Sequence, residues 1–250
     1  MKIAVISDIH GNIPAFEAVL EDIEWRNVDK IFCLGDIIGK GPSSKEAIDL
    51  CRERCDLVVR GNWDAMLYRV YNGTARKANE RQQWFVDAAG TEGMEYLGAL
   101  PHCIEIFMSG RLIRLFHANP LDFTRCHPSS PEELRLSMFG FGGDAAIKRE
   151  SDMAIYADIH SVFVQTMKGR QLLNVGSVGN PLDFTQSSYA ILEGTEGEEQ
   201  APFVLQFVRV PYDIDRAIKM AEDAGLPWLD AYVSELTTAK YFQRDVLSAD

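Results

Sequence analysis

Residues 2–12 read KIAVISDIHGN, a short apolar run that is followed at once by an acidic residue and a histidine. A run of this length and composition is typical of a strand buried inside a sheet, and we expect the strand to cover residues 3–7. The polar residues 8–12 then form a loop. An amphipathic helix is expected to begin near Asn12 and to continue to Ile23, because apolar residues recur there at helical spacing.

The same unit recurs along the chain, which indicates a layered α/β fold. Helical patterns separate the early strands, and after residue 100 the pattern changes to hairpins. Short apolar runs that predict further strands cover residues 30–34, 57–59, 104–108, 112–116, 153–156, 162–167, 171–175, 189–192 and 203–210.

Two longer stretches predict helices. Residues 63–100 are expected to be mostly helical, with interruptions at Asn72-Gly73 and at Gly90, and an amphipathic tail is expected between residue 213 and Asp250. Because no repeat and no Pro/Ser linker divides the chain, we predict a single domain over residues 1–250 with a helical C-terminal extension from about residue 211.

The composition excludes several classes of protein. The chain has 250 residues, 46% of them hydrophobic, with 25 Lys and Arg against 37 Asp and Glu, giving a net charge of −12. Such a surface repels polyanions, so non-specific binding of duplex DNA and of anionic membranes is not expected. The five cysteines are scattered, and no apolar run reaches the ~18 residues of a membrane helix, so we expect a soluble cytoplasmic protein.

Residue types that bind metals recur just after the predicted strands. Because the loops at the carboxyl ends of such strands converge on one crevice, these side chains are candidates for a shared site. The candidate ligands are Asp8, His10, Asp36, Asn62, His117, Asp158 and His160.

The donor set suggests the kind of metal centre. All the donors are oxygen or nitrogen, which favours hard divalent ions over soft ones. The set exceeds what one tetrahedral ion needs, so a two-ion centre is expected. In such a centre a carboxylate bridges both ions, and a bridging hydroxide attacks phosphorus in line. Manganese is the expected metal, with iron, zinc, nickel and magnesium as alternatives.

These residues carry a resemblance to a known family. The motifs Asp8-Ile9-His10, Gly35-Asp36, Gly61-Asn62-Trp63-Asp64, His117 and Ile159-His160, in this order, resemble the calcineurin-like metallophosphoesterase pattern. Residues 174–179 and 188–192 also fit the small bacterial phosphodiesterase branch, and the resemblance extends from residue 2 to about residue 210. It implies a four-layer α/β/β/α sandwich with two facing mixed sheets.

The resemblance also implies roles for the candidate ligands. Asp8, His10, Asp36 and His160 would hold the first metal ion. Asp36 would bridge to a second ion held by Asn62 and His117. Asp36, Asn62 and His117 are accordingly the expected catalytic residues.

Two positions depart from the family pattern. Asp158 stands where the family has a histidine, and its carboxylate reaches about 1–2 Å less far from the backbone. Asp158 is therefore either a seventh ligand or a change that weakens the second metal site. Trp63 stands where the protein phosphatases of the superfamily have a histidine that assists the leaving group, and tryptophan cannot donate that proton. His102 and His127 are the other histidines that could supply it.

Residues beside the ligands are candidates for substrate contact. We predict that Asn12 and Arg60 bind substrate. Basic residues on the helical stretch are candidates for meeting a substrate phosphate, although most such clusters are a solvated helix face; they are Arg69, Arg76, Lys77 and Arg81. Phe123, Phe139 and Phe141 are expected to pack in the core rather than to stack on a base.

The expected function is hydrolysis of a phosphodiester in a small, nucleotide-like substrate by a dinuclear metal centre. Two alternatives stay open. The first is a binding scaffold with a damaged second metal site, as Asp158 suggests, and the second is a Ser/Thr protein phosphatase, which Trp63 disfavours. The C-terminal helices are the candidate surface for an oligomer.

Overall fold

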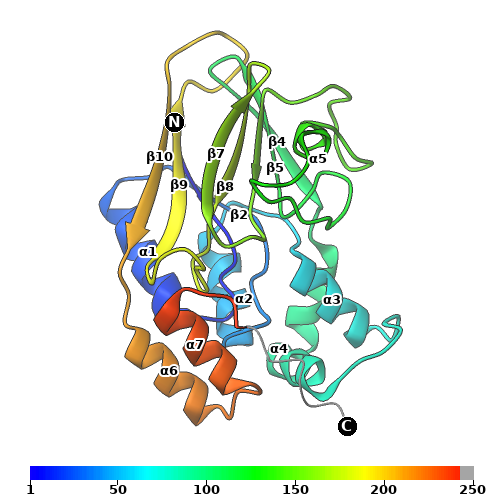
Figure 1. The fold of residues 1–250 in the computed structure, drawn as a ribbon, viewed down its shortest axis with the longest axis vertical. Helices are drawn as coiled ribbons and strands as arrows, with labels where there is room; N and C mark the ends of the chain where they lie inside the picture. The colour runs from blue at the N-terminus through cyan, green and yellow to red at the C-terminus, as the bar shows by residue number, and fades with distance from the viewer. Residues whose placement is uncertain (243–250) are drawn as a thin grey trace.

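The computed structural model describes residues 1–242 and contains two five-stranded sheets that face each other (Figure 1). The first sheet has the strand order β10-β9-β1-β2-β3. Its central strand β1 is parallel to β2 and antiparallel to β9. The strands are β1 (Lys2–Ile6), β2 (Lys30–Cys33), β3 (Leu57–Val58), β9 (Ser187–Gly194) and β10 (Phe203–Val210).

The second sheet has the order β4-β5-β6-β8-β7. Two antiparallel hairpins, β4–β5 and β7–β8, lie on either side of the parallel pairs that β6 forms with β5 and β8. The strands are β4 (Cys103–Met108), β5 (Arg111–Phe116), β6 (Met153–Tyr156), β7 (Val162–Met167) and β8 (Arg170–Val175). Both sheets are therefore mixed, as predicted.

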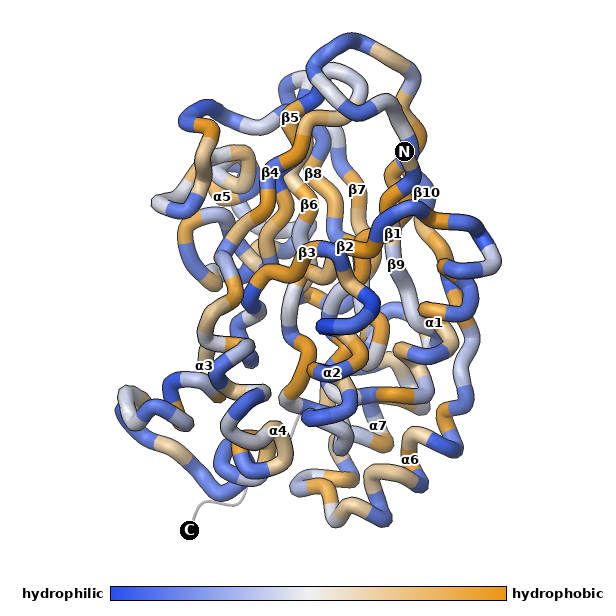
Figure 2. Tube along the Cα trace, turned by 180° about the vertical axis from the view of Figure 1, so that it is seen from behind, coloured by the Kyte–Doolittle hydropathy of each residue, from blue (hydrophilic) through white to orange (hydrophobic). Residues whose placement is uncertain are grey.

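Successive side chains of strand β1 point to opposite faces of the first sheet and so enter two different cores. Ile3 and Val5 point into the core between the sheets, whereas Ala4 and Ile6 point into the core under the helices. All four side chains are fully buried, which is why this run reads as continuously apolar. In Figure 2 the strands form a hydrophobic interior between more hydrophilic outer segments.

Helices cover the outer face of the first sheet. They are α1 (Ile13–Trp25), α2 (Ser44–Arg54), α3 (Asn62–Tyr71), α4 (Glu80–Ala99), α6 (Ile214–Asp223) and α7 (Leu229–Thr238). The helical stretch predicted over 63–100 is two helices, and Gly90 breaks α4 with φ 68° and ψ 170°. Helices α6 and α7 form the predicted C-terminal extension, and α6 packs against α1. The part of the predicted tail after residue 242 lies outside the described residues.

The outer face of the second sheet is covered mainly by residues 117–152, which contain only the short helix α5 (Glu132–Ser137). The four-layer arrangement is thus confirmed, with a fourth layer that is largely loop. Among the helices of the described residues, none is long and apolar enough to cross a membrane.

A buried arginine fastens this fourth layer to the sheet. The Arg114 side chain in β5 is fully buried and pairs with Glu105 of β4 at 2.5 Å. Its guanidinium also donates to four backbone carbonyls of the loop layer, those of Phe139, Gly140, Ile147 and Arg149. This one side chain therefore ties four backbone carbonyls of the loop layer to strand β5.

Candidate metal centre

The loops that follow β1, β2, β5 and β6, together with the start of α3, bring all seven predicted ligands to one place. Six of them are buried, and Asn62 is partly buried. The structure therefore assembles the site at the carboxyl ends of the strands, as the sequence predicted.

The backbone at this site is unusual. Asp8, His10, Asp36, Asp158 and His160 all adopt left-handed conformations, with φ between 51° and 65°. Residues other than glycine rarely do so, because the side chain crowds the backbone. These left-handed residues lie in the loops that follow β1, β2 and β6. Such strain is typical of functional sites.

The side chains form two overlapping clusters that could each hold a cation. One contains Asp8, His10 and His160, and the other contains Asp8, Asp36 and His117. Asp36, a member of the second cluster, also approaches the first, because its Oδ2 lies 3.4 Å from His117 Nε2 and 3.6 Å from His10 Nε2.

The three histidines are oriented by the backbone. The Nδ1 atoms of His10, His117 and His160 lie 3.1, 2.7 and 2.6 Å from the carbonyl oxygens of Ile38, Leu34 and Asn180. Since a carbonyl only accepts, each Nδ1 carries a proton and each Nε2 points into the site. This is the arrangement that fixes histidine ligands in metalloproteins.

Several buried polar atoms fit a divalent cation. Asp8 Oδ1, Asn62 Oδ1 and His117 Nε2 are buried without a hydrogen bond. The Nε2 atoms of His10 and His160 face each other at 3.2 Å, an arrangement that needs a proton or a cation between them once both Nδ1 atoms donate elsewhere. Buried polar atoms left unpaired are costly, and bound cations would satisfy them.

Charges within the site shift its pKa values in opposite directions. Burial lowers the pKa of His10, and the neighbouring His160 and Lys40 add to this effect. Burial also disfavours the charged form of His117, but the adjacent Asp36, Asp8 and Asp158 outweigh it and hold the pKa of His117 well above its ordinary value. Without metal, these carboxylates therefore favour the protonated form of His117.

Metal binding should therefore release protons. Ligation requires neutral imidazole, so we expect His117 to release a proton when a cation binds, in addition to the proton held between His10 Nε2 and His160 Nε2. Because the proton competes with the ion, affinity should fall as the pH is lowered. Calorimetric titration of EDTA-treated protein with Mn²⁺ in buffers of different ionisation enthalpy measures the proton count. The His117→Asn variant should release fewer protons on binding Mn²⁺ than the wild-type protein. A wild-type binding heat that does not depend on the buffer would contradict the proton release.

The chain is similar to proteins of a known family over most of its length. The family model described as "Calcineurin-like phosphoesterase superfamily domain" matches residues 1–197. The chain belongs to this superfamily. An uncharacterized protein of Methanocaldococcus jannaschii is 32% identical over 91% of this chain and 95% of its own length. A metallophosphoesterase from Sphaerobacter thermophilus superposes with a TM-score of 0.74 at 26% identity, over 96% of this chain and 100% of its own.

The chain is also similar to symmetrical bis(5'-nucleosyl)-tetraphosphatases. The symmetrical bis(5'-nucleosyl)-tetraphosphatase of Erwinia tasmaniensis is 30% identical over 35% of this chain and 34% of its own length. Family membership makes the chain a phosphoesterase hydrolase of a metal-dependent family, with candidate ligand clusters in place.

Asp158 lies near the other predicted ligands of this calcineurin-like phosphoesterase, but its carboxylate is bound by protein side chains and belongs to neither cluster. Arg125 clamps its carboxylate at 2.7 and 3.0 Å, and Asn62 Nδ2 donates to it at 2.9 Å. His117 Nε2 is 4.0 Å away. Asp158 thus lies beside the second cluster, and its hydrogen bond to Asn62 leaves Asn62 Oδ1 facing the site. Its role as a ligand stays a prediction.

The two predicted substrate-binding residues are placed elsewhere. Asn12 caps α1, accepting from Ala15 N and donating to the carbonyl of Gly179, and it is fully buried. Arg60 donates to the carbonyl of Gly98 at the end of α4. Both side chains are used to hold helices, so this geometry does not support the predicted substrate contacts.

Three contacts at the site were not predicted. Asp64, quoted only as part of a motif, accepts from the backbone N–H groups of Asp36, Ile37 and Gly61, and burial together with Asp36 raises its pKa to about 7. Arg125 comes from an insert without sequence signals. Lys40 bonds Asn180 and pairs with Glu235, and these partners lie 140 and 195 residues away.

The remaining histidine and aromatic candidates differ in whether they lie at the metal centre, in the core or at the surface. His127 lines the 440 Å³ cavity at the metal centre, beside Asp158 and His160. His102 instead contacts the backbone carbonyl of Asn119. Phe139 is buried in the core, as expected, whereas Phe141 is 39% exposed, which corrects the expectation that it packs there. Phe123 lies against the rings of His102 and His117.

Proposed function

We propose that this phosphoesterase is a dinuclear metal-dependent phosphodiesterase that acts on small, nucleotide-like phosphoesters. The observation that carries the proposal is the pair of clusters that share Asp8, with Asp36 of the second cluster also close to His10 of the first. Two cations this close together suit a phosphoryl group, whose charged oxygens are then neutralised from both sides. Residues 1–250 would act as a single domain.

The ligands would divide as follows. Asp8, His10, Asp36 and His160 would hold the first ion, and Asp36, Asn62 and His117 the second. When bound, the ions would supply Lewis-acid polarisation of the phosphoryl oxygens and acidify water, with manganese as the expected metal. The left-handed loops keep the ligands in place before substrate arrives.

The neighbours of the site favour good leaving groups. Trp63 donates its backbone N–H to Asp36 Oδ1, and its indole offers no proton to a departing alkoxide. His127 is the histidine of the described residues that lines the cavity without serving as a proposed ligand. Arg125, which holds Asp158, is half-exposed in the same cavity and could turn to an anionic substrate.

Elemental analysis and a turnover assay test the proposal together. We expect two ions per purified chain and Mn-dependent hydrolysis of bis(p-nitrophenyl) phosphate, faster than hydrolysis of the monoester p-nitrophenyl phosphate. Asp158→His is the comparison variant, since it restores the family's residue. Metal-loaded protein without activity on any activated phosphodiester would contradict the proposal.

The same experiment separates the two alternatives. A scaffold with a damaged second site would bind one ion or none and gain turnover only as Asp158→His. A protein phosphatase would hydrolyse phosphopeptides selectively. The presence of the other six predicted ligands at one site argues against a decayed scaffold.

A further inference from the structure

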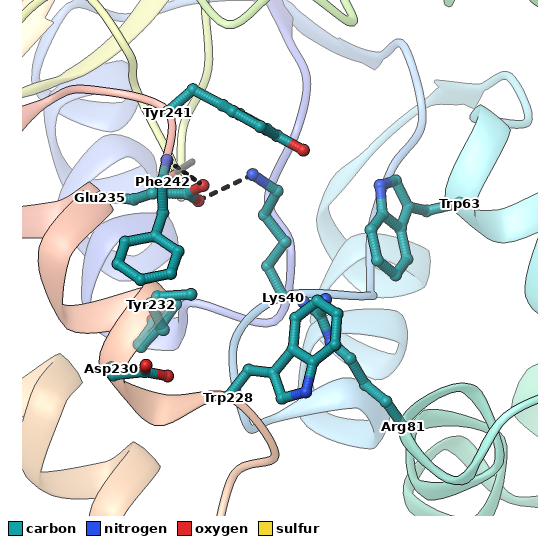
Figure 3. Close-up of a pocket in the computed structure, with 10 residues that line it drawn as sticks. Lys40, Trp63, Arg81, Trp228, Asp230, Tyr232, Glu235, Tyr241 and Phe242 are labelled. Carbon is teal, nitrogen blue, oxygen red and sulfur yellow. Dashed lines mark hydrogen bonds and ion pairs between the residues drawn. The ribbon is translucent and has the colours of Figure 1, made fainter. Parts of the chain in front are cut away.

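Three cavities meet around Trp63, which borders all of them. The first, of 440 Å³, is the cavity at the metal centre. The second, of 390 Å³, lies against α7 (Figure 3). It is called here the hairpin cavity, after the helical hairpin that α6 and α7 form. The third, of 890 Å³, is called the outer cavity, and it is also bordered by Asn62, a proposed metal ligand. A molecule bound at the metal centre can therefore extend into the outer cavity.

Arg81 forms part of the wall between the hairpin cavity and the outer cavity (Figure 3). Its guanidinium carbon lies 4.4 Å from the ring centre of Trp228 and 5.3 Å from that of Trp63, so the group is held between aromatic rings. Its Nε is buried without a hydrogen bond. No ion pair involves Arg81 within residues 1–242.

The backbone helps to place this stack. Trp228 precedes α7 and adopts a left-handed conformation with φ 63°, an uncommon state for a bulky residue. By contrast, Lys40 in the hairpin cavity is neutralised by Glu235 at 2.8 Å. Arg81 thus differs from Lys40 in having charge available for a ligand.

The outer cavity has an unusual charge for this protein. Among residues 1–242, its lining includes four cations, Arg69, Arg76, Lys77 and Arg81, and no carboxylate. None of the four takes part in an ion pair within the described chain, although the protein carries a net charge of −12. The hairpin cavity, in contrast, is bordered by Asp230 and Glu235. Of these three cavities, the outer cavity is therefore the one whose described lining has cations without a carboxylate.

We propose that Arg81 and the outer cavity bind phosphate groups that the substrate carries beyond the one that reacts. The ligand class is a polyphosphate ester, and its placement next to the metal centre rests on the proposed function. Arginine suits this task because its planar group donates two parallel hydrogen bonds to phosphate oxygens. Four cations match a short phosphate chain, whereas the net negative surface around them repels a long polyanion.

The site depends on the C-terminal helices. Trp228 lies beyond the residues 1–197 that the family model matches, so the hairpin of α6 and α7 adds one wall to a site that the matched part of the chain does not complete. Substrate choice would then differ between relatives with and without this extension.

Binding of inorganic tripolyphosphate to the EDTA-treated full-length chain tests the proposal. We expect tripolyphosphate to bind at least about 10-fold tighter than orthophosphate, and Arg81→Gln to weaken its binding about 10-fold. Arg149→Gln is the matched control, since Arg149 also lies over an aromatic ring, that of Phe107, at 5.9 Å. Its effect should be below about 2-fold. The exposed pair Arg76→Gln/Lys77→Gln tests the same cavity if Arg81→Gln does not fold.

Three results would overturn the proposal. One is equal binding of orthophosphate and tripolyphosphate, and another is an equal loss in Arg81→Gln and Arg149→Gln. The third is tighter binding of a single-stranded oligonucleotide that has the same number of phosphates, which would indicate a nucleic-acid ligand. Because binding is measured without metal, a failure of turnover would count against the proposed function and not against this site.

Discussion

The Asp36→Asn variant is expected to lower metal-dependent phosphodiester turnover about 1,000-fold, which corresponds to about 4 kcal/mol of lost transition-state stabilisation. The reason is the position of Asp36 Oδ2, which lies 3.6 Å from His10 Nε2 of the first cluster and 3.4 Å from His117 Nε2 of the second. Asparagine keeps the shape and can still accept from Trp63 N, but it removes the charge that two cations would share. Turnover and metal content should be measured together.

The metal content of Asp36→Asn should fall from two ions to one or none, while the circular dichroism of the metal-free protein stays unchanged. Asp56→Asn is the control, because Asp56 is an exposed acid that accepts from Ile31 N at 2.8 Å. If Asp36→Asn keeps wild-type turnover and two bound ions, then Asp36 does not bridge the two ions.

The Arg114→Met variant is expected to destabilise the protein by about 3–5 kcal/mol. Methionine fills similar space but leaves Glu105 buried without its cation, and four carbonyls of the loop layer lose their donor. For a chain of this size the melting temperature should fall by about 10 °C. Thermal unfolding by circular dichroism measures the change.

Arg149→Met provides the matched control for Arg114→Met. The Arg149 side chain is half-exposed, and its ion pair with Asp152 is long, at 3.4 Å. Removing its guanidinium should therefore lower the free energy of unfolding by less than about 1 kcal/mol. Equal melting temperatures for the two variants would mean that the buried pair does not fasten the fourth layer.

Most of the fold was predictable because its signals are local. Continuous apolar runs such as residues 2–6 mark strands that are buried on both faces, and polar residues mark where they end. The convergence of Asp8, Asp36 and His117 followed from one rule, that the carboxyl ends of such strands meet.

The unpredicted features depend on distant contacts. The Arg125 clamp on Asp158 joins residues 33 positions apart through an insert without periodicity. The pair of Lys40 and Glu235 spans 195 positions. The contacts of Asn12 with Ala15 N and of Arg60 with the Gly98 carbonyl were also not predicted, because proximity in sequence to a proposed ligand does not determine which way a side chain points, and their roles in substrate binding stay predictions.

The left-handed ligand positions imply a conflict between durability and activity. Glycine would relieve the backbone at Asp8, His10, Asp36, Asp158 and His160, each of which costs on the order of 1 kcal/mol in this conformation. A chain selected only to resist heat would therefore lose its acids and histidines at these sites. Engineering for thermostability should leave these five positions untouched and seek its gains elsewhere in the molecule.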